Sequence, residues 1–168
     1  MSAEVTELRG REGLERIGEL IADIRFAMLT TVAADGSLDS RPMATQKAQF
    51  DGTLWFLTSS DSRKASEIAE NAQVCVAYAD PDDAKYVSLK GRANVSEDRA
   101  KIHELWSPAY KAWFPEGEDD SQIRVLRVDV TEGEFWDATD GKVVRSVKYL
   151  AAAAGASVKM GEHGSVSL

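Results

Sequence analysis

A run of hydroxyl and cationic side chains follows the hydrophobic segment Leu54–Leu57. In order, the run contains Thr58, Ser59, Ser60, Asp61, Ser62, Arg63 and Lys64. A helix that begins here would add unpaired backbone N–H groups and the partial positive charge of its first turn. Such a combination binds phosphate without a glycine-rich P-loop. An Asp or Ser N-cap followed by ordinary surface cations would give the same residues, and composition alone leaves the two interpretations equal.

Arg41 is a further cation that the fold would bring to this run. It lies in the segment Ser40–Gln46, which is predicted to be a strand. Consecutive strands are commonly neighbours in a sheet, so this segment is expected to pair with the predicted strand Thr53–Thr58. Arg41 would then complete a phosphate site at the start of the helix.

Four tryptophans are spread over the chain, at Trp55, Trp106, Trp113 and Trp136. Trp55 follows the alternation of a strand and is predicted to be a packing residue. Trp106 and Trp113 flank a loop that also carries Tyr110, and Trp136 lies near the end of the last predicted strand. Aromatic side chains in such places form a wall for a stacked ring or a contact between subunits, although packing over the end of a barrel is the commoner explanation.

The acidic balance of the chain limits its partners. Its 168 residues carry a formal net charge of −8, which argues against a nucleic acid or an anionic membrane, because both need a basic face. No apolar run approaches the length of a membrane span, about 20 residues, and no signal sequence is recognisable, so a cytoplasmic location is expected. A local basic pocket for a small anion is compatible with this charge.

Most motifs of enzymes that use side-chain chemistry are absent from the sequence. It has no P-loop, no GxSxG elbow and no GxGxxG motif. His103 and His163 show no metal-ligand spacing, and Cys75, the only cysteine, lies in an apolar strand pattern typical of an inert core thiol. No metal site and no catalytic residue are therefore assigned, and any redox chemistry would come from an organic cofactor.

The hydropathy pattern predicts a mainly β protein, an antiparallel β-barrel with flanking helices. Strands are expected at 26–46, as a hairpin with an Asp35-Gly36 turn, and at 53–58, 73–80, 86–96 (with a bulge at Gly91) and 123–137. Helices are expected at 8–24, 62–70 and 98–106. Residues 1–150 are predicted to form a single domain with an N-terminal helix, and residues 151–168 a flexible tail.

These residues resemble the pyridoxamine 5′-phosphate oxidase superfamily. Leu54–Tyr78, LWFLTSSDSRKASEIAENAQVCVAY, is similar to the segment that binds flavin mononucleotide (FMN) in that family. The segment SLDSRPMATQ, residues 37–46, resembles the paired strand that supplies a second phosphate-binding arginine. VLRVDVTEGEFWD, residues 125–137, resembles the late strand that ends in Glu-Phe-Trp. The match runs from about Ile24 to Asp137.

The resemblance implies an FMN-binding split barrel of the antiparallel Greek-key type, assembled as a homodimer with flavin in clefts at the subunit interface. The residues that it places around the phosphate group are Arg41, Thr58, Ser62, Arg63 and Lys64, and Ser59 of the hydroxyl run is a further candidate contact of the cofactor. Those that it places around the isoalloxazine ring or over the cleft are Met43, Ala44, Thr45, Tyr86, Trp106, Trp113 and Trp136.

The sequence departs from the oxidases after Glu-Phe-Trp. The oxidases continue with an Arg-x-His-x-Arg cluster that grips substrate and flavin, whereas this chain has DATDGKVVRSVKY, with Lys142 and Arg145 but no histidine. Oxidation of pyridoxamine 5′-phosphate is therefore not expected. The layout, including LWSPAYKAWFPEGEDD at residues 105–120, is more similar to the general stress protein branch.

The resemblance predicts an FMN-binding protein of the general stress type that acts as an oxidoreductase on a small redox substrate, which the sequence does not identify. Three alternatives stay open. They are FAD in place of FMN, a deazaflavin-dependent reductase, and a flavin-binding module that senses redox state without turnover. The acidic balance argues mildly against a deazaflavin, because its acidic tail usually needs a larger basic groove.

Overall fold

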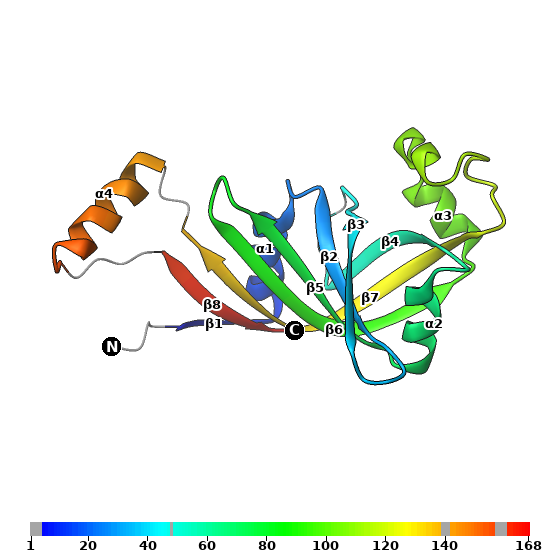
Figure 1. The fold of residues 1–168 in the computed structure, drawn as a ribbon, viewed down its shortest axis with the longest axis horizontal. Helices are drawn as coiled ribbons and strands as arrows, with labels where there is room; N and C mark the ends of the chain where they lie inside the picture. Colours follow the sequence, from blue (N-terminus) through cyan, green and yellow to red (C-terminus); the bar gives the residue numbers. More distant parts are fainter. Residues whose placement is uncertain (1–4, 48, 139–141, 157–160) are drawn as a thin grey trace.

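The computed structural model describes residues 5–47, 49–138, 142–156 and 161–168, and one eight-stranded sheet forms their centre (Figure 1). The strands are β1 (Val5–Arg9), β2 (Phe26–Val32), β3 (Leu38–Ala44), β4 (Thr53–Ser59), β5 (Gln73–Asp80), β6 (Lys85–Ser96), β7 (Ile123–Asp137) and β8 (Glu162–Ser167). The helices are α1 (Gly10–Ile21), α2 (Arg63–Glu70), α3 (Arg99–Leu105), the 3-10 helix η1 (Pro108–Ala112) and α4 (Lys142–Ala153). None of the described helices is long and apolar enough to cross a membrane.

The sheet curves around a core without closing, so the fold is a mainly β split barrel with flanking helices, as predicted. Its strands follow the order β1-β8-β7-β6-β5-β2-β3, and β4 pairs with β7. Among the described strands every pair is antiparallel except β1–β8, which is parallel. The predicted bulge is confirmed, because the β6–β7 register shifts between Lys90 and Gly91.

β4 does not lie where the order of the chain predicts. We expected it beside the strand that carries Arg41, but that strand, β3, pairs with β2, and β4 pairs with the first half of β7. The β4–β7 pair places Leu54 and Phe56 in the main core with Val128 of β7. The predicted β3–β4 pair was wrong because burial of this apolar stripe decides the neighbour of β4, and hairpin order does not.

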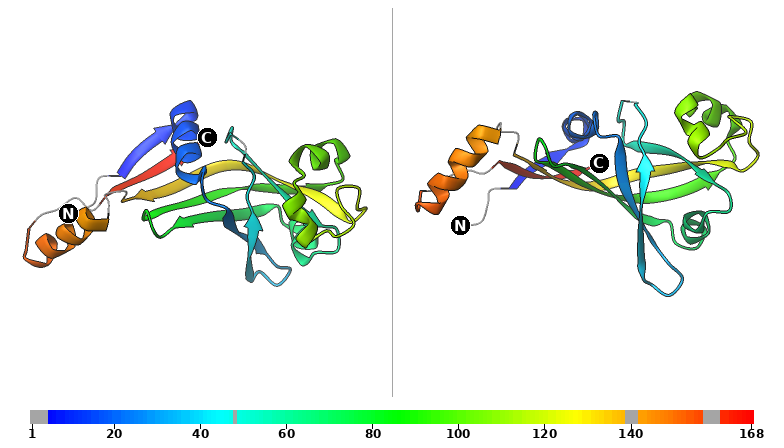
Figure 2. Two further views of the ribbon diagram at one scale, coloured as in Figure 1. Left: turned by 90° about the horizontal axis from the view of Figure 1, so that it is seen from above. Right: turned by 45° about the horizontal axis from the view of Figure 1, so that its top comes forward.

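Two clusters of buried side chains lie beneath the helices. α1 and α2 cover the main cluster inside the curved sheet, through Ile17 and Ile68. α3 and η1 cover a second cluster that includes Ile102, and Figures 1 and 2 show α3 and α4 at opposite ends of the molecule. β4 contributes Phe56 to the main cluster and Leu57 to the second. Both clusters therefore hold the end of β4 that leads into α2.

The C-terminal segment ends in a strand, which corrects the expectation of a flexible tail at residues 151–168. β8 lies between β1 and β7 and pairs with both, while residues 157–160 lie outside the described residues. A Cβ atom at Gly164 would come within 2.3 Å of the ring of Phe135, so the backbone of β8 lies in close contact with this side chain of β7. The Gly and Ser residues of β8 have low strand propensity, which is why the sequence pattern missed it.

Candidate functional site

The turn from β4 into α2 presents hydroxyl groups and has no side-chain cap. Ser62 is the N-cap residue of α2, with extended backbone angles (φ −70°, ψ 140°), yet its side chain makes no capping hydrogen bond. Its hydroxyl oxygen lies instead 3.2 Å from that of Thr58. The hydroxyl of Ser59 donates to the carboxylate of Asp61. The first turn of α2 is thus left without the side-chain cap that the simpler interpretation of this run requires.

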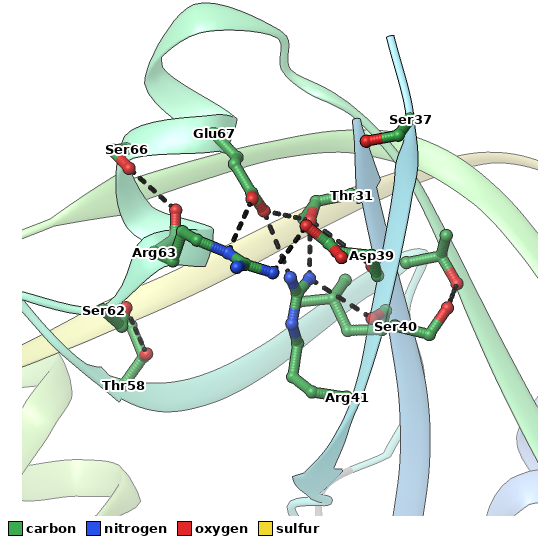
Figure 3. A network of polar contacts seen from close by, with 12 residues as sticks. Thr31, Ser37, Asp39, Ser40, Arg41, Thr58, Ser62, Arg63, Ser66 and Glu67 are labelled. Carbon is green, nitrogen blue, oxygen red and sulfur yellow. Dashed lines mark hydrogen bonds and ion pairs between the residues drawn. The ribbon is translucent and has the colours of Figure 1, made fainter. Parts of the chain in front are cut away.

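Arg41 and Arg63 converge on one carboxylate, that of Glu67 (Figure 3). Nη2 of Arg41 lies 3.1 Å from Oε2, and Nε of Arg63 lies 3.2 Å from Oε1. Arg41 also donates from Nη1 to the hydroxyl of Thr31 on β2, over 2.5 Å. Nη2 of Arg63 lies 2.7 Å from Oδ2 of Asp39 on β3. The β2–β3 hairpin, and not a β3–β4 pair, brings Arg41 to α2.

Glu67 is a buried acid that holds its charge. Only 6% of its surface is exposed. The hydrogen bond from the Thr31 hydroxyl does most to lower the pKa of Glu67, desolvation opposes it, and the charge of Arg41 lowers the pKa further. Glu67 was not among the residues predicted for the site. Its spacing of four residues from Arg63 on a predicted helix was the signal that could have found it.

Lys64 is the third cation of the site and has no direct partner. Its side chain is half-buried, and it makes no hydrogen bond or ion pair with any residue in the described part of the chain. Burial lowers the pKa of Lys64, and the nearby charge of Arg41 lowers it further, against the attraction of Asp61 and Glu67. Arg41 and Lys64 therefore stand close enough to repel each other, as two cations that share an anion would.

β3 continues from Arg41 into the residues expected beside a ring. Met43 follows on the same face of the strand and is buried, with 5% of its surface exposed. Thr45, just beyond β3, is tied to the end of the α1–β2 connection, because its hydroxyl donates to the carbonyl of Ile24 over 2.6 Å. Ala44, between them, packs against the second cluster. One strand and its end thus carry both a candidate phosphate-site arginine and the candidate ring contacts.

The aromatic side chains of α3 and η1 form a tilted series near the end of β3. The ring centroids of Trp106 and Tyr110 are 5.9 Å apart, and those of Tyr110 and Trp113 are 6.1 Å apart. Trp106 packs against the second cluster, as Ala44 does, and the hydroxyl of Tyr110 accepts a hydrogen bond from Gln46. Trp113 is 58% exposed. Of the tryptophans proposed to cover a ligand, Trp106 therefore packs on the same buried cluster as Ala44 of β3.

Tyr86 and Trp136 lie on the opposite face of the sheet from Arg41. They are paired across β6 and β7. Together with Phe26 and Met28 they form an exposed apolar face and line a shallow recess of about 320 Å³. His163 of β8, which the sequence analysis assigned to the tail, stacks on Trp136 at 5.0 Å with the rings 9° from parallel. Within one chain, the structure does not bring Tyr86 and Trp136 to Arg41, Arg63 and Lys64, the cations of the candidate phosphate site.

Comparison with known proteins places this geometry in a family. The model of the family "Pyridoxamine 5′-phosphate oxidase like" matches residues 12–158. The chain belongs to this family. No protein of curated function matches the sequence.

Several solved structures share the fold of this pyridoxamine 5′-phosphate oxidase-like chain. A protein of Jannaschia sp. CCS1, named a general stress protein 26, is 25% identical with a TM-score of 0.73, over 89% of this chain and 94% of its own. The general stress FMN/FAD binding protein of Xanthomonas citri is 25% identical with a TM-score of 0.65, over 76% and 90%. General stress protein 26 of Bacillus anthracis str. Sterne, 24% identical with a TM-score of 0.65 over 73% and 92%, has the same fold. The predicted family membership is thus confirmed.

Proposed function

We propose that the protein binds FMN with the phosphate group at the start of α2, and that it is a flavin-dependent oxidoreductase of the general stress type. The observation that carries this proposal is the state of Lys64. This cation is half-buried beside Arg41 and has no direct partner among the described residues. A bound phosphate group would supply both the negative charge and the hydrogen-bond acceptors that Lys64 lacks.

The groups that would hold the phosphate come from three elements. Lys64 contributes its ammonium group, Thr58 and Ser62 their hydroxyls, and the first turn of α2 its backbone N–H groups. Each guanidinium has five N–H donors, and the contacts of Arg41 and Arg63 with Glu67, Thr31 and Asp39 leave some of these uncommitted. When bound, the flavin would supply hydride or electron transfer, while the protein fixes its position.

The surroundings of the cations favour FMN over a cofactor with a longer acidic tail. A groove between α2 and the β2–β3 turn begins at Arg63, and its other charged lining residues are Asp35, Asp39, Glu67 and Glu70. Carboxylates repel a second phosphate group. FAD or a deazaflavin would have to direct its additional anionic groups away from this groove, whereas FMN ends at the first phosphate.

We propose that the protein is a homodimer and that its partner contributes to the ring site. Phe26, Met28, Tyr86 and Trp136 are 54%, 42%, 43% and 40% exposed and lie on one face of the sheet. A contiguous exposed apolar face of this kind supports contact with another protein surface, and a two-fold axis would let two copies bury this face. Tyr86 and Trp136 do not reach Arg41 in their own chain, so any contact that they make with a bound flavin would have to come from the partner.

A titration of the purified protein with FMN tests the proposed binding. FMN fluorescence should be quenched on binding, riboflavin should bind far more weakly because it lacks the phosphate, and excess inorganic phosphate should compete with FMN. FAD and a deazaflavin titrated in parallel should bind more weakly than FMN. A protein that fails to bind FMN would overturn the proposal. Oxidation of NADH or NADPH by the FMN-loaded protein would then separate an oxidoreductase from a flavin-binding module that does not turn over.

A further inference from the structure

We infer that Glu67 acts as an internal counter-anion that limits the affinity of the site for phosphate, so that removing its negative charge tightens phosphate binding. This inference rests on the proposed function, because it assigns a role to Glu67 at the proposed phosphate site. Glu67 would then set the affinity with which the protein binds its cofactor.

The Glu67 carboxylate is divided between the two guanidiniums. Oε2 lies 3.1 Å from Arg41, and Oε1 lies 3.2 Å from Arg63. Two oxygens of a phosphate group placed between the same arginines would use the same kind of charge-assisted hydrogen bond. Every N–H group that Glu67 holds is therefore withdrawn from an incoming phosphate, and the phosphate must bind through the remaining donors or displace the carboxylate.

Glu67 is also fixed in place. The Thr31 hydroxyl donates to Oε2 over 2.5 Å, from a residue with no exposed surface. Glu67 itself comes from inside the α2 helix and is only 6% exposed. A carboxylate on the surface would rotate into water when an anion arrived, but this one is held against the guanidiniums by β2. Its negative charge consequently acts on any phosphate that binds.

The charges of the cluster are nearly balanced. Arg41, Arg63 and Lys64 are opposed by Glu67 and Asp39, both in direct contact with the arginines, and by Asp61, whose charge attracts Lys64. Removal of one of these carboxylate charges therefore leaves the cluster with one net positive charge for a phosphate to meet. At a separation of several ångströms in a partly buried site, this is enough to change affinity by about tenfold.

A purely structural role for Glu67 predicts the opposite result. If the carboxylate mainly held the two guanidiniums in the correct orientation for phosphate, its loss would weaken binding. Glu67→Gln separates the two roles, since glutamine keeps the shape and one acceptor oxygen while it removes the charge. Glu70→Gln is the matched control, because Glu70 lies on the same helix, lines the same groove and forms no ion pair with either arginine.

The experiment measures dissociation constants for FMN and riboflavin with the full-length wild-type protein, E67Q and E70Q. We expect E67Q to bind FMN about tenfold more tightly than wild type, with riboflavin affinity unchanged, because riboflavin has no phosphate to sense the charge. E70Q should change FMN affinity by less than about twofold. Without ligand, E67Q should unfold at a lower temperature than wild type, and saturating inorganic phosphate should raise that temperature more in E67Q than in wild type.

The outcomes separate this inference from the proposed function. Wild type and E67Q that both fail to bind FMN would overturn the proposed function and this inference with it. If wild type binds FMN and E67Q binds it equally well or more weakly, the counter-anion role is overturned and the proposed function is not. If E67Q does not fold, Asp39→Asn provides the same test from the more exposed counter-anion, whose Oδ2 lies 2.7 Å from Arg63. D39N should then bind FMN about two- to threefold more tightly, and unchanged or weaker binding would overturn the inference.

Discussion

The hydroxyl of Thr31 donates to Oε2 of Glu67 over 2.5 Å, and neither side chain is accessible to more than a trace of solvent. The contact joins β2 to α2 and lowers the pKa of the Glu67 carboxyl more than any other interaction. The same hydroxyl oxygen accepts a hydrogen bond from Arg41. Thr31 of β2 therefore orders both the carboxylate of Glu67 and the guanidinium of Arg41 in the candidate phosphate site.

Thr31→Val should destabilise the fold measurably. Valine keeps the shape but removes the hydroxyl donor of Glu67 and one of the acceptors of Arg41, which retains its contact with Glu67, at a cost of about 1–3 kcal/mol in the free energy of unfolding. Thr30→Val is the matched control, because within the described part of the chain the Thr30 hydroxyl bonds to that of Ser40 at the exposed surface, and its loss should change the free energy by about 0.5 kcal/mol or less. Urea unfolding followed by tryptophan fluorescence gives both values. Equal effects of the two variants would contradict the role assigned to Thr31.

Acid should destabilise the protein in part through Glu67. Its folded-state pKa lies below the ordinary value of 4.5, so its contribution to stability is complete above pH 4.5 and is lost as the pH falls through the lowered pKa. We expect the free energy of unfolding, measured in urea from pH 7 to pH 3, to fall less steeply below pH 4.5 in E67Q than in wild type. Asp35→Asn is the comparison, because the pKa of Asp35 is also lowered, by Ser37, but at an exposed turn. If the free energy of unfolding falls as steeply below pH 4.5 in E67Q as in wild type, Glu67 does not contribute to the acid sensitivity.

Lys64→Met should weaken FMN binding without unfolding the protein. Methionine keeps the length and packing of the side chain but removes the ammonium group, and loss of one charge-assisted hydrogen bond corresponds to about a 10- to 100-fold increase in the dissociation constant. The control is Lys90→Met, at an exposed lysine of β6 that pairs with Glu132 of β7 and points away from the buried core. Isothermal titration calorimetry with FMN measures both. If K64M and K90M both bind FMN with the affinity of the wild-type protein, Lys64 does not contact the phosphate group.

The sequence was sufficient to predict most elements and the residues of the cation cluster. Local patterns carry that information, because strand alternation and helix periodicity lie within each segment, and β5 and β7 were predicted to the residue. The partner of β4 could not be predicted, since it depends on which distant strand buries Leu54 and Phe56. Glu67 was missed for a related reason. Nothing in its local sequence shows that Thr31 and Arg41, both far away in the chain, converge on it.

Gly164→Ala should test whether β8 is an integral part of the sheet. A Cβ atom at this position would lie 2.3 Å from the Phe135 ring and 2.8 Å from the Thr6 carbonyl oxygen, so β8 would have to move from β7 or β1. Overpacking of this kind costs about 1–3 kcal/mol. Ser167→Ala, at the exposed end of the same strand, is the control and should be nearly neutral. Thermal unfolding distinguishes the two, and a neutral G164A would show that β8 contributes little to stability.

Trp136→Glu should dissociate the proposed homodimer. The wild-type protein is expected at twice the chain mass of 18.3 kDa in analytical ultracentrifugation. A carboxylate placed on the apolar face of Phe26, Met28 and Tyr86 would be unpaired and desolvated in the dimer, so W136E should sediment as a monomer. Leu150→Glu, at a 72% exposed position on α4, is the matched control and should leave the mass unchanged.

The same variant links assembly to cofactor binding. Because Tyr86 and Trp136 lie on the face opposite Arg41 in their own chain, they can contact a flavin at the phosphate site only from a partner. W136E should therefore lose FMN affinity in parallel with dimerisation, although the Arg41–Glu67–Arg63 cluster is intact, while L150E should lose neither. A wild-type protein that sediments as a monomer yet binds FMN would overturn the dimer proposal and leave the phosphate site standing. A monomeric W136E with full FMN affinity would show that the site is complete within one chain.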